Sequence, residues 1–130
     1  MNQFIENQNW RYATKKFDAT KIISDHDLDI LKEAIRLSTS SYGLQPYKVF
    51  IIENPELRAK LQPAAWGQSQ IVEASHLFIF ANIVDFGNAE IEDAIENLTE
   101  IRSLPSGSLD GFGDFMKSKI TTLPVETRNN

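Results

Sequence analysis

Hydrophobic residues recur most clearly at helical spacing in the segment that follows Ser24. Leu28 and Leu31 begin an apolar stripe with intervals of three and four residues, and this stripe predicts a helix over 25–38. Ser24 and Asp27 have the spacing of a capping box, with Asp in place of the commoner Glu. The pair therefore marks the first turn of this helix.

Two further helices are indicated later in the chain. The segment 54–63 opens with Asn-Pro, an N-cap residue followed by proline at the first helical position. The segment 90–102 returns to helical spacing, and we interpret its acidic polar face as solvated. The Gly- and Ser-rich segment 103–113 predicts a loop, and the Leu-Pro pair at 123–124 predicts the start of another helix.

Two continuous apolar runs, Val49–Ile52 and Leu77–Ala81, predict strands. Because the runs do not alternate with polar residues, we expect both strands to be covered on both faces in a layered domain of helices and sheet. His76 directly precedes the second strand and is expected to be packed and hydrogen-bonded. His26 lies in a polar first helical turn and is expected to be solvated.

Composition narrows the chemistry that the 130 residues can perform. The absence of cysteine excludes disulfides, thiolate metal sites and a cysteine nucleophile, and two histidines argue against a multi-histidine metal centre. A net charge of -5 with thirteen scattered Lys and Arg argues against nucleic-acid binding. The chain has no apolar run of membrane-spanning length and no signal-peptide pattern at its start, so we predict a soluble cytoplasmic protein.

Three polar clusters could bind a ligand. The cations around Arg11 and Lys15 could hold a phosphate, although a basic pair is also typical of a solvated surface. The segment 38–47 combines small hydroxyl residues with a glycine, which would let a flat ligand approach, or it forms only a helix end and a turn. The segment 64–70 carries a tryptophan and two amides that suit the edge of a heterocycle, or it is an ordinary loop.

In their order and separation these clusters resemble one family. The motifs are R-x-x-T-K-x-F-D from Arg11, S-x-S-S-x-G-x-Q-P-Y from Ser38, and A-S-H at 74–76. Together they resemble the nitroreductase family, flavin mononucleotide (FMN) enzymes that oxidise NADH or NADPH and reduce nitroaromatics and quinones. The resemblance is good from Trp10 to Ala81. It implies an α+β fold with a central, mainly antiparallel sheet flanked by helices, and a homodimer with the flavin at its interface.

The resemblance also implies a role for individual residues. Arg11 would pair with the flavin phosphate and Lys15 would reach the pyrimidine edge. The other implied cofactor contacts are Tyr12 and Ala13 beside the phosphate, Thr39, Ser40, Ser41 and Gly43 from the partner subunit, and Gln68 and Gln70 near the pyrimidine. Tyr42 and Trp66 would bind substrate at the open face. Because the hydride chemistry belongs to the flavin, no catalytic side chain and no metal ligand is assigned.

The chain departs from the family pattern in several places. Ala13 replaces a common serine, and Gly67 and Gln70 stand where some members carry Asn and Lys. A neutral Gln70 would stabilise reduced flavin less than a cation would. Family members are considerably longer, and their carboxy-terminal part completes the flavin site. We therefore expect residues 1–130 to form a single nitroreductase-like domain that is truncated at its carboxy terminus.

Three functional hypotheses follow. The first is an FMN-dependent oxidoreductase that passes hydride from NADH or NADPH through flavin to a small nitroaromatic or quinone acceptor. The second is a truncated or degenerate fragment without activity, which only dimerises or binds a partner. The third is a flavin enzyme of another specificity, such as a dehalogenase or dehydrogenase, which the loop after Pro105 would decide.

Overall fold

The capping box begins a helix at the predicted position. In the computed structural model, which describes residues 2–128, helix α2 spans Asp25–Arg36. Ser24 Oγ accepts a hydrogen bond from the N–H of Asp27 at 3.1 Å and donates one to the Asp27 carboxylate at 2.7 Å. The side chain of Ser24 thus satisfies a backbone donor that the first turn of a helix leaves without a partner.

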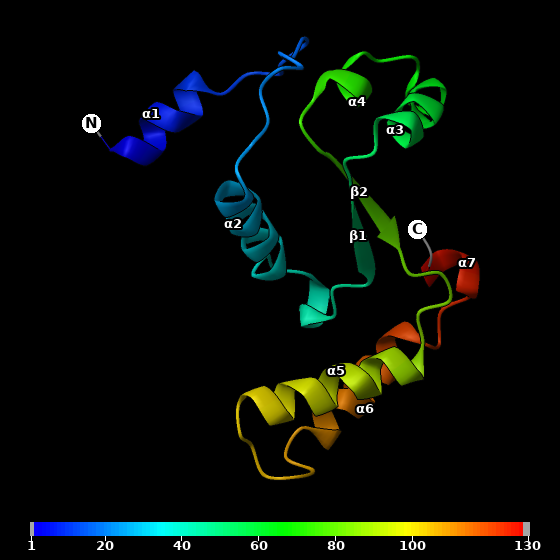
Figure 1. The fold of residues 1–130 in the computed structure, drawn as a ribbon. Helices are drawn as coiled ribbons and strands as arrows, with labels where there is room; N and C mark the ends of the chain where they lie inside the picture. The colour runs from blue at the N-terminus through cyan, green and yellow to red at the C-terminus, as the bar shows by residue number, and fades with distance from the viewer. Residues whose placement is uncertain (1, 129–130) are drawn as a thin grey trace. The chain divides into compact units, whose positions relative to one another are not determined.

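The other elements are distributed along the whole described chain (Figure 1). The α-helices are α1 (Gln3–Trp10), α3 (Pro55–Leu61), α4 (Gln70–Glu73), α5 (Asn88–Ile101), α6 (Asp110–Ile120) and α7 (Val125–Arg128), and the 3₁₀ turns are η1 (Ser41–Gly43) and η2 (Gln62–Ala65). The predicted cap of α3 is confirmed, because Asn54 Oδ1 accepts the N–H of Leu57 at 2.8 Å. No helix within residues 2–128 is long and apolar enough to cross a membrane.

The two predicted strands pair in one sheet, β1 (Tyr47–Ile52) with β2 (Leu77–Asn82). They run antiparallel, since the N–H of Ile83 after β2 donates to the carbonyl of Pro46 before β1 at 2.9 Å. The rings of Tyr47 and Phe80 lie 5.7 Å apart as a cross-strand pair. The combination of helices with an antiparallel sheet confirms the α+β class.

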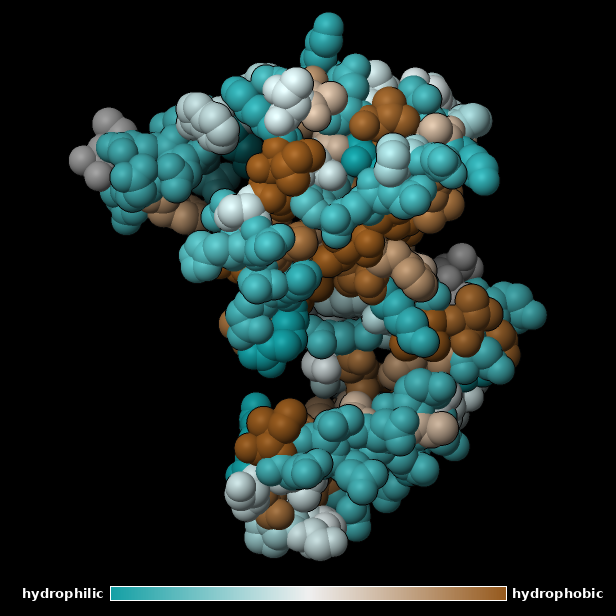
Figure 2. Space-filling model, viewed as in Figure 1, coloured by the Kyte–Doolittle hydropathy of each residue, from teal (hydrophilic) through white to brown (hydrophobic). Residues whose placement is uncertain are grey.

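The prediction that both strands are covered on both faces is wrong for this chain. Phe50 is 52% exposed and Phe80 is 57% exposed. Figure 2 likewise shows hydrophobic residues, in brown, reaching the visible surface among polar ones. A continuous apolar run shows that a strand avoids polar residues, but it does not specify which element covers the strand.

The chain divides into two compact units, which are described separately. The first, unit 1, contains residues 2–28 and Ile51–Ile79, and in it α3 packs on α4 and η2. The second, unit 2, contains Asp29–Phe50 and residues 80–128. Its core consists of Phe86, Ile91 and Met116, with α5 packed on α6.

Helix α6 corrects the sequence prediction of a loop over 103–113. The loop ends before Asp110, and the helix includes both Gly111 and Gly113. Gly113 is buried, and a Cβ atom at this position would lie 3.4 Å from Cγ1 of Ile95 on α5. The glycine that read as a loop signal is therefore a point of close helix–helix approach.

Candidate functional site

The cationic segment Arg11–Lys15 in unit 1 has no regular secondary structure and is exposed. Within residues 2–128, neither the Arg11 nor the Lys15 side chain makes a hydrogen bond or an ion pair. The backbone N–H groups of Tyr12 and Ala13 also donate to no group in this part of the chain. The segment therefore offers two cations and two backbone donors to a ligand.

The residues that follow this segment attach it to helix α4 and to the residues directly after that helix. The N–H of Phe17 donates to Oε2 of Glu73 at 3.3 Å. The N–H of Ile23 donates to Oγ of Ser75 at 3.0 Å. These two contacts, each spanning more than fifty residues, bring the predicted phosphate segment to the helix that begins with Gln70.

The loop before α4 presents the predicted tryptophan. Trp66 has a φ of 55° and is 91% exposed, and Gly67 follows with a φ of 71°. Gln62 Nε2 donates to the carbonyl of Gly67 at 3.2 Å, which holds this left-handed turn. Gln68 is exposed and Gln70 is partly buried at the start of α4. Unit 1 therefore contains two of the three predicted clusters.

The third cluster, 38–47, lies in unit 2 and is held by a glutamine. Gln45 Nε2 donates to the carbonyls of Arg36 and Ser38, both at 3.0 Å, and the Gln45 N–H donates to Ser40 Oγ at 2.8 Å. Gln45 thus ties the loop to the end of α2. The sequence motif contains Gln45, but only the structure shows that its side chain binds the backbone at the end of α2.

The exposed part of this loop contains Thr39, Ser41, Tyr42 and Gly43. Tyr42 has a φ of 54°, and its ring meets Phe115 of α6 edge to face with centroids 6.1 Å apart. Ser41 and Tyr42 also line a cavity of about 340 Å³ within unit 2. Phe115 was not among the predicted site residues, because its segment offered no periodic helical signal.

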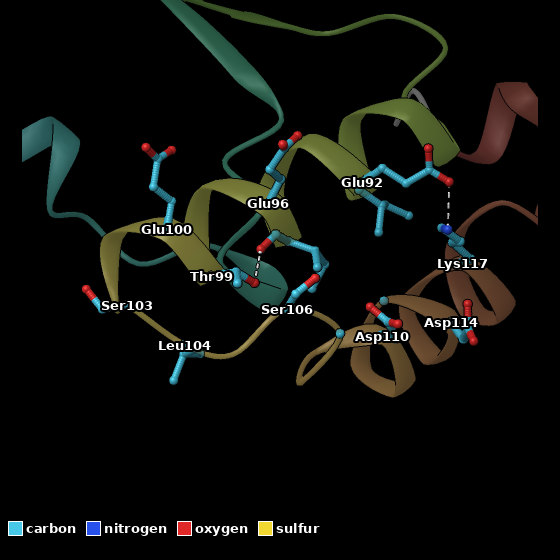
Figure 3. Close-up of a pocket in the computed structure, with 14 residues that line it drawn as sticks. Glu92, Glu96, Thr99, Glu100, Ser103, Leu104, Ser106, Asp110, Asp114 and Lys117 are labelled. Carbon is cyan, nitrogen blue, oxygen red and sulfur yellow. Dashed lines mark hydrogen bonds and ion pairs between the residues drawn. The ribbon is translucent and has the colours of Figure 1, made fainter.

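A larger cavity of about 760 Å³ lies between α5 and α6 (Figure 3). Its charged lining is mainly acidic and consists of Glu92, Glu96, Glu100, Asp110, Asp114 and one cation, Lys117. A hydrogen bond from Lys117 Nζ to Glu92 Oε1 at 2.7 Å raises the pKa of Lys117, and the ammonium is thereby paired with a carboxylate. The carboxylates would repel a phosphate, so this cavity does not suit a nucleotide cofactor. Residues 2–128 contain no cluster of His, Asp or Glu side chains arranged to hold a metal ion.

The A-S-H segment supports the fold. The side chain of His76 is 6% exposed, and its Nδ1 lies 2.7 Å from Oγ of Ser75, which confirms the packed, hydrogen-bonded role expected for it. His76 Nε2 lies 3.6 Å from Oε1 of Glu53. Arg58 is buried beside this segment and donates to its backbone carbonyls. Sequence reasoning missed Arg58, since nothing in its helix distinguishes it from a solvated arginine.

Comparison with known proteins places the three clusters in one family. The family model described as "Nitroreductase family" matches residues 9–103, which include all three motifs. The chain belongs to the nitroreductase family. It is 37% identical over 112 residues to "Putative NAD(P)H nitroreductase YfkO" of Bacillus subtilis, covering 85% of this chain and 51% of that relative. It is 41% identical over 78 residues to "Putative NAD(P)H nitroreductase" of Haemophilus influenzae, covering 59% of this chain and 36% of that relative.

Solved structures share the nitroreductase fold. A "putative NAD(P)H:FMN oxidoreductase" of Staphylococcus epidermidis matches with a TM-score of 0.79 at 18% identity, over 98% of this chain and 60% of that one. A "putative nitroreductase" of Exiguobacterium sibiricum, solved in complex with FMN, matches with a TM-score of 0.73 at 20% identity, over 95% of this chain and 59% of that one. This nitroreductase-family chain spans about half the length of the curated relatives it matches, or less. The roles of individual site residues stay predictions.

Proposed function

We propose that this nitroreductase-family chain forms part of an FMN-dependent oxidoreductase. The enzyme would transfer hydride from NADH or NADPH through the flavin to a nitroaromatic or quinone acceptor. The observation that carries the proposal is the unpartnered cationic segment Arg11–Lys15, attached to α4. The names of the relatives and the FMN complex of a structural neighbour support the same function.

The residues of unit 1 fit the chemistry of FMN. The exposed Arg11 guanidinium can form a forked, charge-assisted contact with a phosphate, and the N–H groups of Tyr12 and Ala13 add neutral donors. The side-chain amides of Gln68 and Gln70 can pair with the alternating donors and acceptors of a pyrimidine edge.

When bound, FMN would supply the hydride chemistry. Lys15 would place a cation where negative charge develops as the flavin ring is reduced, and so stabilise the reduced form. The exposed Trp66 and Tyr42 offer aromatic surfaces for the nicotinamide or the acceptor. We assign no proton-transferring side chain and no metal.

The proposal includes a homodimer with the flavin at its interface. Thr39, Ser40, Ser41 and Gly43 would contact the cofactor from the partner subunit. Ser40 Oγ already accepts the Gln45 N–H, and its O–H remains able to donate to the cofactor. We further propose that residues 1–130 belong to a single nitroreductase-like domain that acts in the cytoplasm.

The proposal is tested by adding FMN to the purified chain and measuring bound flavin by absorbance and fluorescence. We expect a yellow complex that consumes NADH or NADPH in the presence of a nitroaromatic. Lys15→Met should weaken FMN binding or lower the flavin potential without unfolding the chain, whereas Lys48→Met, at an exposed position of β1, should leave both unchanged.

Two outcomes would count against these assignments. A chain that stays colourless with FMN would contradict the oxidoreductase and favour the non-enzymatic alternative, which is motivated by the partial coverage of the relatives. Equal FMN affinity and equal flavin potential in Lys15→Met would remove the role of Lys15. NADH-dependent reduction of a nitroaromatic by this chain would eliminate the non-enzymatic alternative.

A further inference from the structure

Arg58 is the buried charged residue of the described part of the chain, with 5% of its surface exposed. Its guanidinium faces three backbone carbonyls and, within residues 2–128, no carboxylate. Nε donates to Ile71 at 2.8 Å, Nη1 donates to Ser75 at 3.1 Å, and Nη2 donates to Ala74. Burial of a cation is costly unless its donors are satisfied, and these three carbonyls offset that cost for Arg58.

The contacts of Arg58 stabilise helix α4, which is too short to be stable alone. Helix α4 has four residues, and one helical turn is unfavourable without tertiary support. Ile71 lies within α4, and Ala74 and Ser75 follow it directly. A cation at the carboxyl end of a helix satisfies free carbonyls and complements the helix dipole. Arg58 therefore anchors α4 to α3.

Helix α4 in turn holds the cationic segment. Glu73 is its last residue and accepts the N–H of Phe17 at 3.3 Å. Phe17 follows Lys15 by only two residues, so its contact with Glu73 fixes the backbone close to Lys15. Ser75, whose carbonyl Arg58 also binds, accepts the N–H of Ile23 through its hydroxyl.

We propose that Arg58 is a positioning residue for the flavin site: it holds α4 through three carbonyls, and α4 places Lys15 through the contact between Glu73 and Phe17. This inference rests on the proposed FMN function. Arg58 contacts no ligand in this scheme and acts only through the backbone that it binds. A lysine cannot replace it, because an ammonium is a compact donor that does not reproduce the planar fork.

The test is a double-mutant cycle on FMN affinity, measured by fluorescence titration of the full chain. Arg58→Lys and Glu73→Ala should each raise the dissociation constant about tenfold, the effect of losing one well-placed hydrogen bond. In a Lys15→Met background each should raise it less than about threefold, because the group that they position is then absent. Arg102→Lys and Glu100→Ala, at exposed positions in unit 2, are the matched controls and should leave the affinity unchanged.

Amide exchange separates this inference from the proposed function. In both variants the Phe17 amide should exchange faster without FMN, with the far-UV circular dichroism unchanged. If Arg58→Lys unfolds, Glu73→Ala carries the test, since it leaves the carbonyl contacts intact. Unchanged Phe17 exchange in Glu73→Ala, or equal effects with and without Lys15, would overturn the positioning role. A native chain that binds no FMN would overturn the proposed function, and with it the flavin part of this inference, even where Phe17 exchange responds as expected.

Discussion

Replacing Gly111 with alanine should stabilise the protein, although the glycine lies in a segment that its sequence marks as a loop. Gly111 is an exposed residue of α6, and a Cβ atom added there meets no atom within 4 Å. Glycine in a helix costs roughly 0.5–1 kcal/mol relative to alanine, because it loses more backbone entropy on folding. The melting temperature should therefore rise by about 2–4 °C for a chain of this length.

Gly113, two residues later, provides the contrast. An added Cβ there lies 3.4 Å from Cγ1 of Ile95, so a larger side chain would press on α5. Leucine at 113 should cost about 1–3 kcal/mol through overpacking. Leucine at 111 extends into open space and should be neutral or mildly stabilising, so the same substitution at both positions is a matched pair.

The assay is thermal and urea unfolding of Gly111→Ala, Gly111→Leu and Gly113→Leu, followed by far-UV circular dichroism. We expect both variants at 111 to unfold at or above the midpoint of the native protein and Gly113→Leu to unfold well below it. Equal midpoints for the two leucine variants would refute the close approach of α5 and α6. A loss of stability in Gly111→Ala would refute the helical assignment of that residue.

Three further changes test the capping, core and charge arguments. Ser24→Ala should lower the free energy of unfolding by about 1 kcal/mol, and Ser24→Asp should retain it, as measured by urea denaturation. Ile91→Ala, at a position with no exposed surface, should cost about 3 kcal/mol, and a loss below about 1 kcal/mol would contradict its place in the core. The Gly87 N–H, followed by the N–H of Glu90 itself, lowers the pKa of Glu90 from its ordinary 4.5. Ionised Glu90 therefore stabilises the folded protein above pH 4.5, and this stabilisation is lost as the pH falls through the lowered pKa of Glu90. Glu90→Gln should flatten the acid side of the pH–stability profile, and an unchanged profile would contradict this contact.

Local signals predicted much of this fold because the interactions behind them are local. The Ser24 cap and the Asn54 cap each satisfy a backbone donor within three residues, so spacing in the chain suffices to identify them. The apolar runs predicted β1 and β2 for a similar reason, since strand backbone favours these residues. The loop at 38–47 was likewise predictable, because the residues of its motif are contiguous in the sequence.

Contacts between distant residues were not predictable in this way. Gly113 resembles a loop glycine until Ile95 of another helix lies against it, and Arg58 resembles a solvated arginine until three carbonyls surround its guanidinium. The contact between Phe17 and Glu73 spans 56 residues, and no local pattern specifies it.

The sequence by itself determined where α2 and α3 begin, where the two strands lie, which family the motifs resemble, and that any redox chemistry would need a cofactor rather than a cysteine thiol. The tertiary structure alone decided that the cationic segment is attached to α4, that a buried arginine holds this helix, and that acidic residues of α5 and α6 line a cavity within unit 2. The physical reason is the range of the forces involved. Caps and periodicity act within a few residues, whereas burial and the satisfaction of buried donors depend on groups that only folding brings together.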